Sequence, residues 1–100
     1  MTGIVLSVLD HAPHDWYLLQ SAEEYFLDVN CSASWLGYSL LIRLDAAERA
    51  DVLAGGRAAC DRLAGRLRDT ASPRHPRDVS RDYGDAVSDA IARWRKDAEG

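Results

Sequence analysis

The chain has 100 residues, of which 47% are apolar and 28% are charged, and its formal net charge is −4. We therefore expect one small folded domain over residues 1–100. No apolar stretch approaches the roughly 20 residues of a membrane span, and the first residues lack the pattern of a signal peptide. These features argue against a membrane protein and a disulfide-rich secreted one, and the acidic balance disfavours nucleic-acid binding; the expected compartment is the cytoplasm.

Four strands are predicted in the first half of the chain. Residues 4–9 are rich in Ile, Val and Leu, and residues 16–20 form the second apolar run. Residues 25–30 and 35–44 alternate apolar and polar side chains, as a half-buried strand does. For the second run, a helix over residues 13–24 that starts at Pro13 is the alternative.

Two helices are predicted in the second half. Asp45 and Glu48 have the spacing of a capping box, so the first helix should begin there. Gly55 and Gly56 either break this helix or let it pack closely on the sheet, and the continuing apolar stripe favours close packing. Residues 70–77 are expected to form an irregular connection, and Asp78 or Ser80 should cap the second helix. The two stripes are Leu53, Gly56, Cys60, Leu63 and Leu67, and Val79, Tyr83, Val87, Ala90 or Ile91, and Trp94.

Strands that precede helices in one chain are typical of the α+β class. We expect an antiparallel sheet of three or four strands with both helices packed on one face. The other face would then be exposed to solvent.

The segment from Leu27 to Cys31 and from Gly37 to Leu44, followed by Asp45-Ala46-Ala47-Glu48, resembles a recurrent segment of small uncharacterised bacterial proteins. The resemblance covers about a third of the chain. It implies a strand, a turn, a strand and a helix in a bacterial protein, and it implies no activity.

The negative charge is concentrated at one end of the sequence. Residues 1–44 contain five acids, including Asp10, and one base, whereas residues 45–72 and 73–100 each carry equal numbers of both signs. An acidic segment suits a basic protein partner, because complementary charge accelerates encounter. Charged residues of this segment and side chains of the expected exposed sheet face are therefore the partner-binding candidates. They are Asp15, Glu23, Glu24, Phe26, Asp28, Asn30, Trp35 and Arg43.

Other chemistry has weaker support. His11 and His14 have a spacing that two metal ligands can adopt, but solvated turn histidines are the commoner meaning of this pattern. Cys31 and Cys60 are expected to be buried free thiols. No nucleophile elbow, phosphate-binding loop or zinc-protease motif occurs, so we expect no enzyme activity and no cofactor.

Three functions follow from these features. The first is a protein-binding domain, in its most concrete form an immunity-type or antitoxin-type inhibitor of a basic toxin or enzyme. The second is a structural or regulatory domain that associates with itself, for example as a homodimer. The third is a small metal- or ligand-binding protein that uses His11 and His14.

Overall fold

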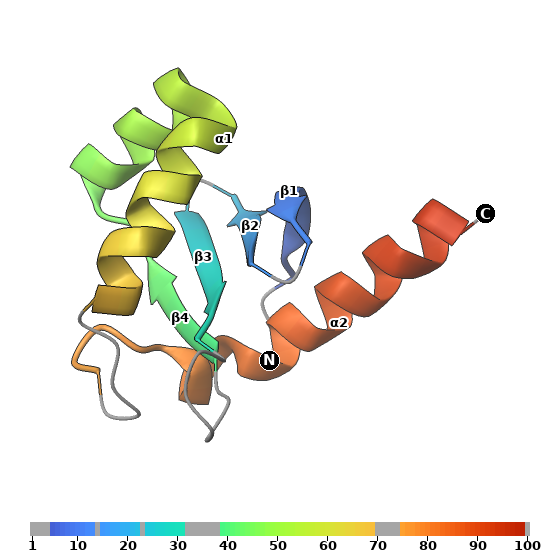
Figure 1. Ribbon diagram of the computed structural model, residues 1–100. Coiled ribbons are helices and arrows are strands. Elements are labelled where there is room, and N and C mark those ends of the chain that lie inside the picture. The colour runs from blue at the N-terminus through green and yellow to red at the C-terminus, as the bar shows by residue number, and fades with distance from the viewer. Residues whose placement is uncertain (1–4, 14, 23, 32–38, 70–74, 100) are drawn as a thin grey trace.

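The computed structural model describes residues 5–13, 15–22, 24–31, 39–69 and 75–99. In chain order its elements are β1 (Ser7–Ala12), β2 (Trp16–Ser21), β3 (Glu24–Asn30), β4 (Ser39–Arg43), α1 (Ala46–Asp69) and α2 (Ser80–Glu99). The predicted α+β class is confirmed, with a four-strand antiparallel sheet followed by two helices (Figure 1). Neither helix in this part of the chain has the length and apolar character needed to cross a membrane.

The sheet is a simple meander in the order β1-β2-β3-β4. Residues 16–21 are a strand, so the alternative helix over residues 13–24 is wrong. The adjacent apolar residues Leu18 and Leu19 explain this outcome, because one points to each face of the sheet and both are buried. The pairing of β1 with β2 is interrupted by a bulge between Val8 and Asp10.

The two helices cover opposite faces of the sheet, so the prediction that both pack on one face is wrong. Figure 1 shows the sheet lying between α1 and α2, with the C-terminal end of α2 projecting past β1. Leu40 and Ile42 of β4 pack in the cluster under α1, whereas Leu41 packs in the cluster under α2. Three consecutive buried residues in one strand require cover on both faces, because successive side chains point to opposite sides.

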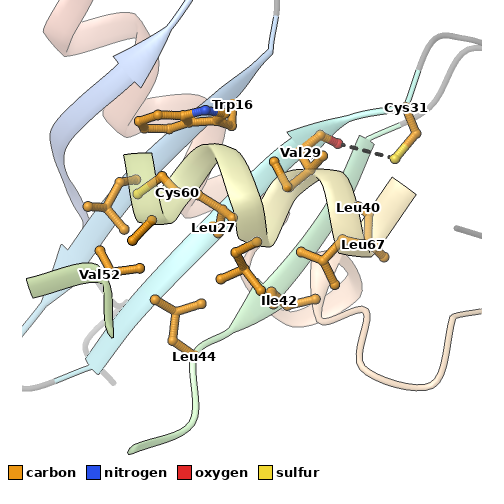
Figure 2. Packing of buried hydrophobic residues seen from close by; sticks show 14 residues of the cluster. Trp16, Leu27, Val29, Cys31, Leu40, Ile42, Leu44, Val52, Cys60 and Leu67 are labelled. Carbon is orange, nitrogen blue, oxygen red and sulfur yellow. Dashed lines mark hydrogen bonds between the residues drawn. The ribbon is translucent and has the colours of Figure 1, made fainter. Parts of the chain in front are cut away.

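The larger cluster lies between α1 and the face formed by residues such as Trp16 and Leu27 (Figure 2). Both cysteines are buried free thiols in this cluster, as predicted. Figure 2 shows them at separate places, Cys60 on α1 near Trp16 and Cys31 beyond the end of β3.

Helix α1 begins at the predicted capping box. The backbone N–H of Glu48 donates to Asp45 Oδ1 at 2.8 Å, and the backbone N–H of Asp45 donates to Glu48 Oε1 at 2.9 Å. The expectation of close packing at the glycine pair is wrong: Gly56 is exposed and has φ 60° and ψ −137°, which kinks the helix. A positive φ is a conformation that glycine adopts without strain. The kink changes the buried face, so that Val52 is buried while Leu53 is 61% exposed.

Helix α2 follows its predicted stripe. Val87 and Ala90 are buried, and Tyr83 and Trp94 are half-buried against the sheet. At its start, Asp78 Oδ1 accepts a hydrogen bond from the backbone N–H of Ser80 at 2.9 Å. Of the predicted irregular connection, residues 70–74 lie outside the described residues.

Candidate functional site

A pocket of about 340 Å³ opens on the face of the sheet that carries α2. We call it the sheet–α2 pocket. Every strand and the last turns of α2 contribute to its wall. The lining residues are His11, Pro13, Asp15, Trp16, Tyr17, Asp28, Asn30, Ser39 and Arg95.

The strand register explains why these residues meet. His11 pairs with Tyr17, and Tyr17 pairs with Asp28, so the three side chains form a row across β1, β2 and β3 on one face. Asn30 and Ser39 form the next row, across β3 and β4. Cross-strand partners have Cβ atoms about 5 Å apart. The pocket is therefore built on rigid strands, a good base for a binding site.

Asp28 is the acid at the centre of the pocket wall. It is half-buried, and this burial, with a smaller contribution from the nearby Asp78 carboxylate, raises its pKa from 3.8 to about 6. In the described part of the chain, its carboxylate has neither a hydrogen-bond donor nor an ion-pair partner. A desolvated carboxylate without a counterion destabilises the fold. Its presence in a pocket therefore indicates a binding site.

Aromatic rings form one side of the pocket. The rings of His11 and Tyr17 lie nearly parallel with centroids 5.6 Å apart. The rings of His11 and Trp94 meet edge to face, with an interplanar angle of 64° and centroids 4.4 Å apart. Arg95 is exposed at this side, and its Nη2 donates to the Tyr17 hydroxyl at 3.2 Å. These contacts fix the Tyr17 ring between the strands and α2.

Arg68 supports the pocket from the other helix. Its Nε donates to the carbonyl oxygen of Asn30 at 3.0 Å, and its Nη2 donates to the carbonyl oxygen of Asp15 at 3.1 Å and to the Asp15 carboxylate. The backbone N–H of Asn30 also donates to the carbonyl oxygen of Asp15 at 2.8 Å. Arg68 thus joins two parts of the pocket wall to α1.

We expect Arg68→Ala to lower the free energy of unfolding by about 1–2 kcal/mol, because it removes charge-assisted hydrogen bonds to two carbonyl groups. Urea denaturation measures this loss, and amide hydrogen exchange at Asn30 should accelerate more than exchange in the core of α1. Arg66→Ala is the matched control, since Arg66 is exposed on the same helix. Equal stability of the two variants would show that Arg68 does not support the pocket.

Most of the described acids of residues 1–44 are paired within the chain. Asp10 pairs with Arg57 at 2.9 Å, Glu24 pairs with Arg43 at 3.3 Å, and Asp15 pairs with Arg68. Two of these partners come from α1. The charge difference between the halves of the sequence is therefore largely balanced across the surface, and Asp28 is the described acid of this segment that has no such partner.

The partner-binding candidates fall into three groups. Asp15, Asp28 and Asn30 meet in the pocket, whereas Glu24 and Arg43 pair with each other away from it. Phe26 is fully buried and packs on Tyr83 of α2 at a centroid distance of 4.9 Å, so its expected place on an exposed face is wrong. Helix α2 covers that part of the face because Phe26, Leu19 and Leu41 make it apolar. Glu23 and Trp35 lie outside the described residues.

Five residues of the pocket were not among the candidates, namely Pro13, Trp16, Tyr17, Ser39 and Arg95. Tyr17 belongs to a predicted strand, but its face depends on the register, and Arg95 is 78 residues away from it in the chain. The polar side of the α2 stripe was the available signal for Arg95, although it does not specify which strand the helix crosses.

The metal candidates are only partly described. His11 lies in the pocket wall, and His14 lies outside the described residues. Among the residues that the structure does describe, no three or more His, Cys, Asp and Glu side chains gather in a way that could hold a metal ion.

Comparison of the chain with protein-family models, with curated proteins and with solved structures found no match.

Proposed function

We propose that the protein is a non-catalytic binding domain that recognises a basic protein partner through the sheet–α2 pocket. The observation that carries this proposal is the Asp28 carboxylate, which lies half-buried in the pocket wall without a counterion from the described part of the chain. A positively charged side chain of the partner would supply the missing counterion. In its most concrete form, we propose an inhibitor of the immunity or antitoxin class. The net charge of −4 agrees with this form of the proposal.

The pocket has the size and composition for such a contact. Its volume of about 340 Å³ lies in the range of protein sites that enclose one small group. Tyr17 and His11 offer aromatic faces on which a cation is attracted by the ring electrons. Asn30 and Ser39 supply further polar atoms near Asp28. Burial of an ion pair between aromatic walls is typical of the few residues that dominate a binding interface.

The first test is a titration of the isotope-labelled protein with blocked tripeptides, in which binding is monitored by the amide chemical shifts of the protein. We expect glycine–arginine–glycine and glycine–lysine–glycine to shift the signals of the β1–β2–β3 row, and glycine–glutamate–glycine to shift none of them. Asp28→Asn should weaken binding of the basic peptides by more than about tenfold, because it removes the charge that attracts them. Asp89→Asn, an equal change at an exposed site of α2, should leave binding unchanged.

Binding should also depend on pH with a definite sign. A carboxyl with a pKa of about 6 is mostly neutral at pH 5 and mostly ionised at pH 7.5, so the basic peptides should bind more tightly at pH 7.5. The other titratable or permanently charged groups around the pocket are Asp78, Asp15, His11 and Arg95, and Asp28→Asn separates their contribution from that of Asp28. Equal binding by wild type and Asp28→Asn at pH 7.5 would contradict the proposal.

A further inference from the structure

Arg95 is a second charged group in the pocket for which the described side chains supply no carboxylate partner. Its guanidinium donates to the hydroxyl of Tyr17 at 3.2 Å. Among the described side chains, which do not include those of residues 98 and 99, no carboxylate lies within ion-pair distance of it. Arg95 lines the pocket and is exposed to solvent.

Asp28 and Arg95 flank the same side chain without meeting each other. Tyr17 is the cross-strand neighbour of Asp28 in the register of β2 and β3, and its hydroxyl at the far end of the ring contacts Arg95. The burial of Asp28 and the proximity of Asp78 raise the pKa of Asp28, and no cation among the described residues offsets them. The pocket therefore contains a carboxylate and a guanidinium that lie beside the same tyrosine and that the described side chains leave without a counterion.

A ligand with both signs of charge would pair both groups at once. A lone cation would be attracted by Asp28 and repelled by Arg95, whereas a dipolar ligand gains at both ends. The carboxylate of such a ligand can accept two parallel hydrogen bonds from a guanidinium, a geometry that favours arginine over other donors. The apolar stem between its charges would lie along Tyr17 and His11.

We propose that the natural ligand of the sheet–α2 pocket is a basic amino-acid residue with a free α-carboxylate, whose cationic side chain meets Asp28 and whose carboxylate meets Arg95. This inference rests on the proposed function and narrows it to the C-terminal end of a basic polypeptide. A free basic amino acid has the same chemistry, and the experiment below distinguishes the two sources.

The test compares four probes by chemical-shift titration at pH 7.5. They are N-acetyl-glycine–glycine–arginine with a free carboxylate, the same peptide as its C-terminal amide, the tripeptide with an internal arginine, and free L-arginine. On the wild-type protein, the peptide with the free carboxylate should bind about tenfold more tightly than its amide, as expected for one charge-assisted contact. If free L-arginine bound more tightly than this peptide, the result would contradict the C-terminal end of a polypeptide as the ligand and would assign the site to the free amino acid.

Two variants test which pocket residue binds each end of the ligand. Arg95→Gln should abolish the preference for the free carboxylate and leave the affinity for the amide unchanged or higher, because the repelling charge is gone. Asp28→Asn should weaken the binding of all four probes. Arg81→Gln, a matched change at an exposed position of α2, should preserve the wild-type order.

The outcomes separate this inference from the proposed function. Equal affinity for the peptide with a free carboxylate and for its amide, with no effect of Arg95→Gln, would overturn the proposal of a dipolar ligand. If Asp28→Asn still weakened binding in that case, the proposed binding site would remain supported. Equal binding of the basic probes by wild type and Asp28→Asn, or no binding of any probe, would overturn both.

Discussion

Replacing Asp28 with asparagine is expected to raise the free energy of unfolding at pH 7.5 by up to about 3 kcal/mol. The reason is the difference between the ordinary carboxyl pKa of 3.8 and the pKa of about 6 in the folded protein, at about 1.4 kcal/mol for each tenfold change. Asparagine keeps nearly the same shape and has no charge to bury. A stability gain of this size from a single polar substitution would be unusual for a residue without a function.

The pH dependence of this gain has a definite sign. Below pH 3.8 Asp28 is protonated in both the folded and the unfolded chain, so its titration contributes nothing to stability there. Between pH 3.8 and about 6 the unfolded chain releases the proton while the folded protein retains it, so the wild type loses stability as the pH rises. Above about pH 6 the loss is complete. The advantage of Asp28→Asn should therefore grow from near zero at pH 4 to its full value at pH 7.5.

Urea denaturation of both proteins at pH 4, 5, 6 and 7.5 measures the difference directly. Asp89→Asn is the control, because Asp89 is exposed on α2 and its charge is already solvated. A difference between wild type and Asp28→Asn that does not change with pH would show that Asp28 has an ordinary pKa. In that case the burial argument for the binding site would fail as well.

Replacing Phe26 with alanine is expected to lower the free energy of unfolding by about 3–5 kcal/mol. The Phe26 side chain is 0% exposed and packs between the sheet and Tyr83 of α2. Its loss leaves a cavity at the contact that holds α2 on the sheet. Since domains of this size have a total stability of about 5–15 kcal/mol, the variant should be close to unfolding at room temperature.

Phe26→Leu should recover most of this loss, because leucine fills much of the same volume. Leu53→Ala is a second comparison, since Leu53 is 61% exposed and its truncation should change stability by less than about 0.5 kcal/mol. Equilibrium denaturation measures all three. A Phe26→Ala variant as stable as the wild type would show that Phe26 does not hold α2, and would restore its place as a surface residue available to a partner.

Local patterns in the sequence predicted the type and order of the elements, although β1 ends at Ala12, three residues after the strand predicted over residues 4–9. The capping box at Asp45 and Glu48, the strand predicted over residues 16–20 and the stripe of α2 all depend on residues a few positions apart. A break at Gly55 and Gly56 was the alternative to close packing, and the continuing stripe favoured the wrong one because it assumes an unbroken helix. Adjacent buried residues such as Leu40, Leu41 and Ile42 were the available signal that both faces of the sheet are covered.

The sequence predicted only some of the residues of the binding site. Asp15, Asp28 and Asn30 were candidates, and the structure brings them together in the pocket. The sequence could not indicate that Arg95 reaches Tyr17, because that contact depends on the direction in which α2 crosses the sheet. It also did not indicate which helix covers Phe26, since the face covered by each helix is a property of the packed structure.

Patterns along the chain predict the order and type of the elements, and the composition sets the net charge of −4 and its concentration in residues 1–44. The role of that charge depends on the packed fold. Arginines from α1 approach Asp10 and Asp15 from 47 and 53 residues away and pair with them, so the acidic half has little unpaired charge at its described surface. Asp28 differs because its strand position turns it into the pocket under α2, where burial raises its pKa and no arginine of the described residues pairs with it. Periodicity depends on neighbours in the chain, whereas charge pairing depends on distances in space, and those arise only when the helices pack on the sheet.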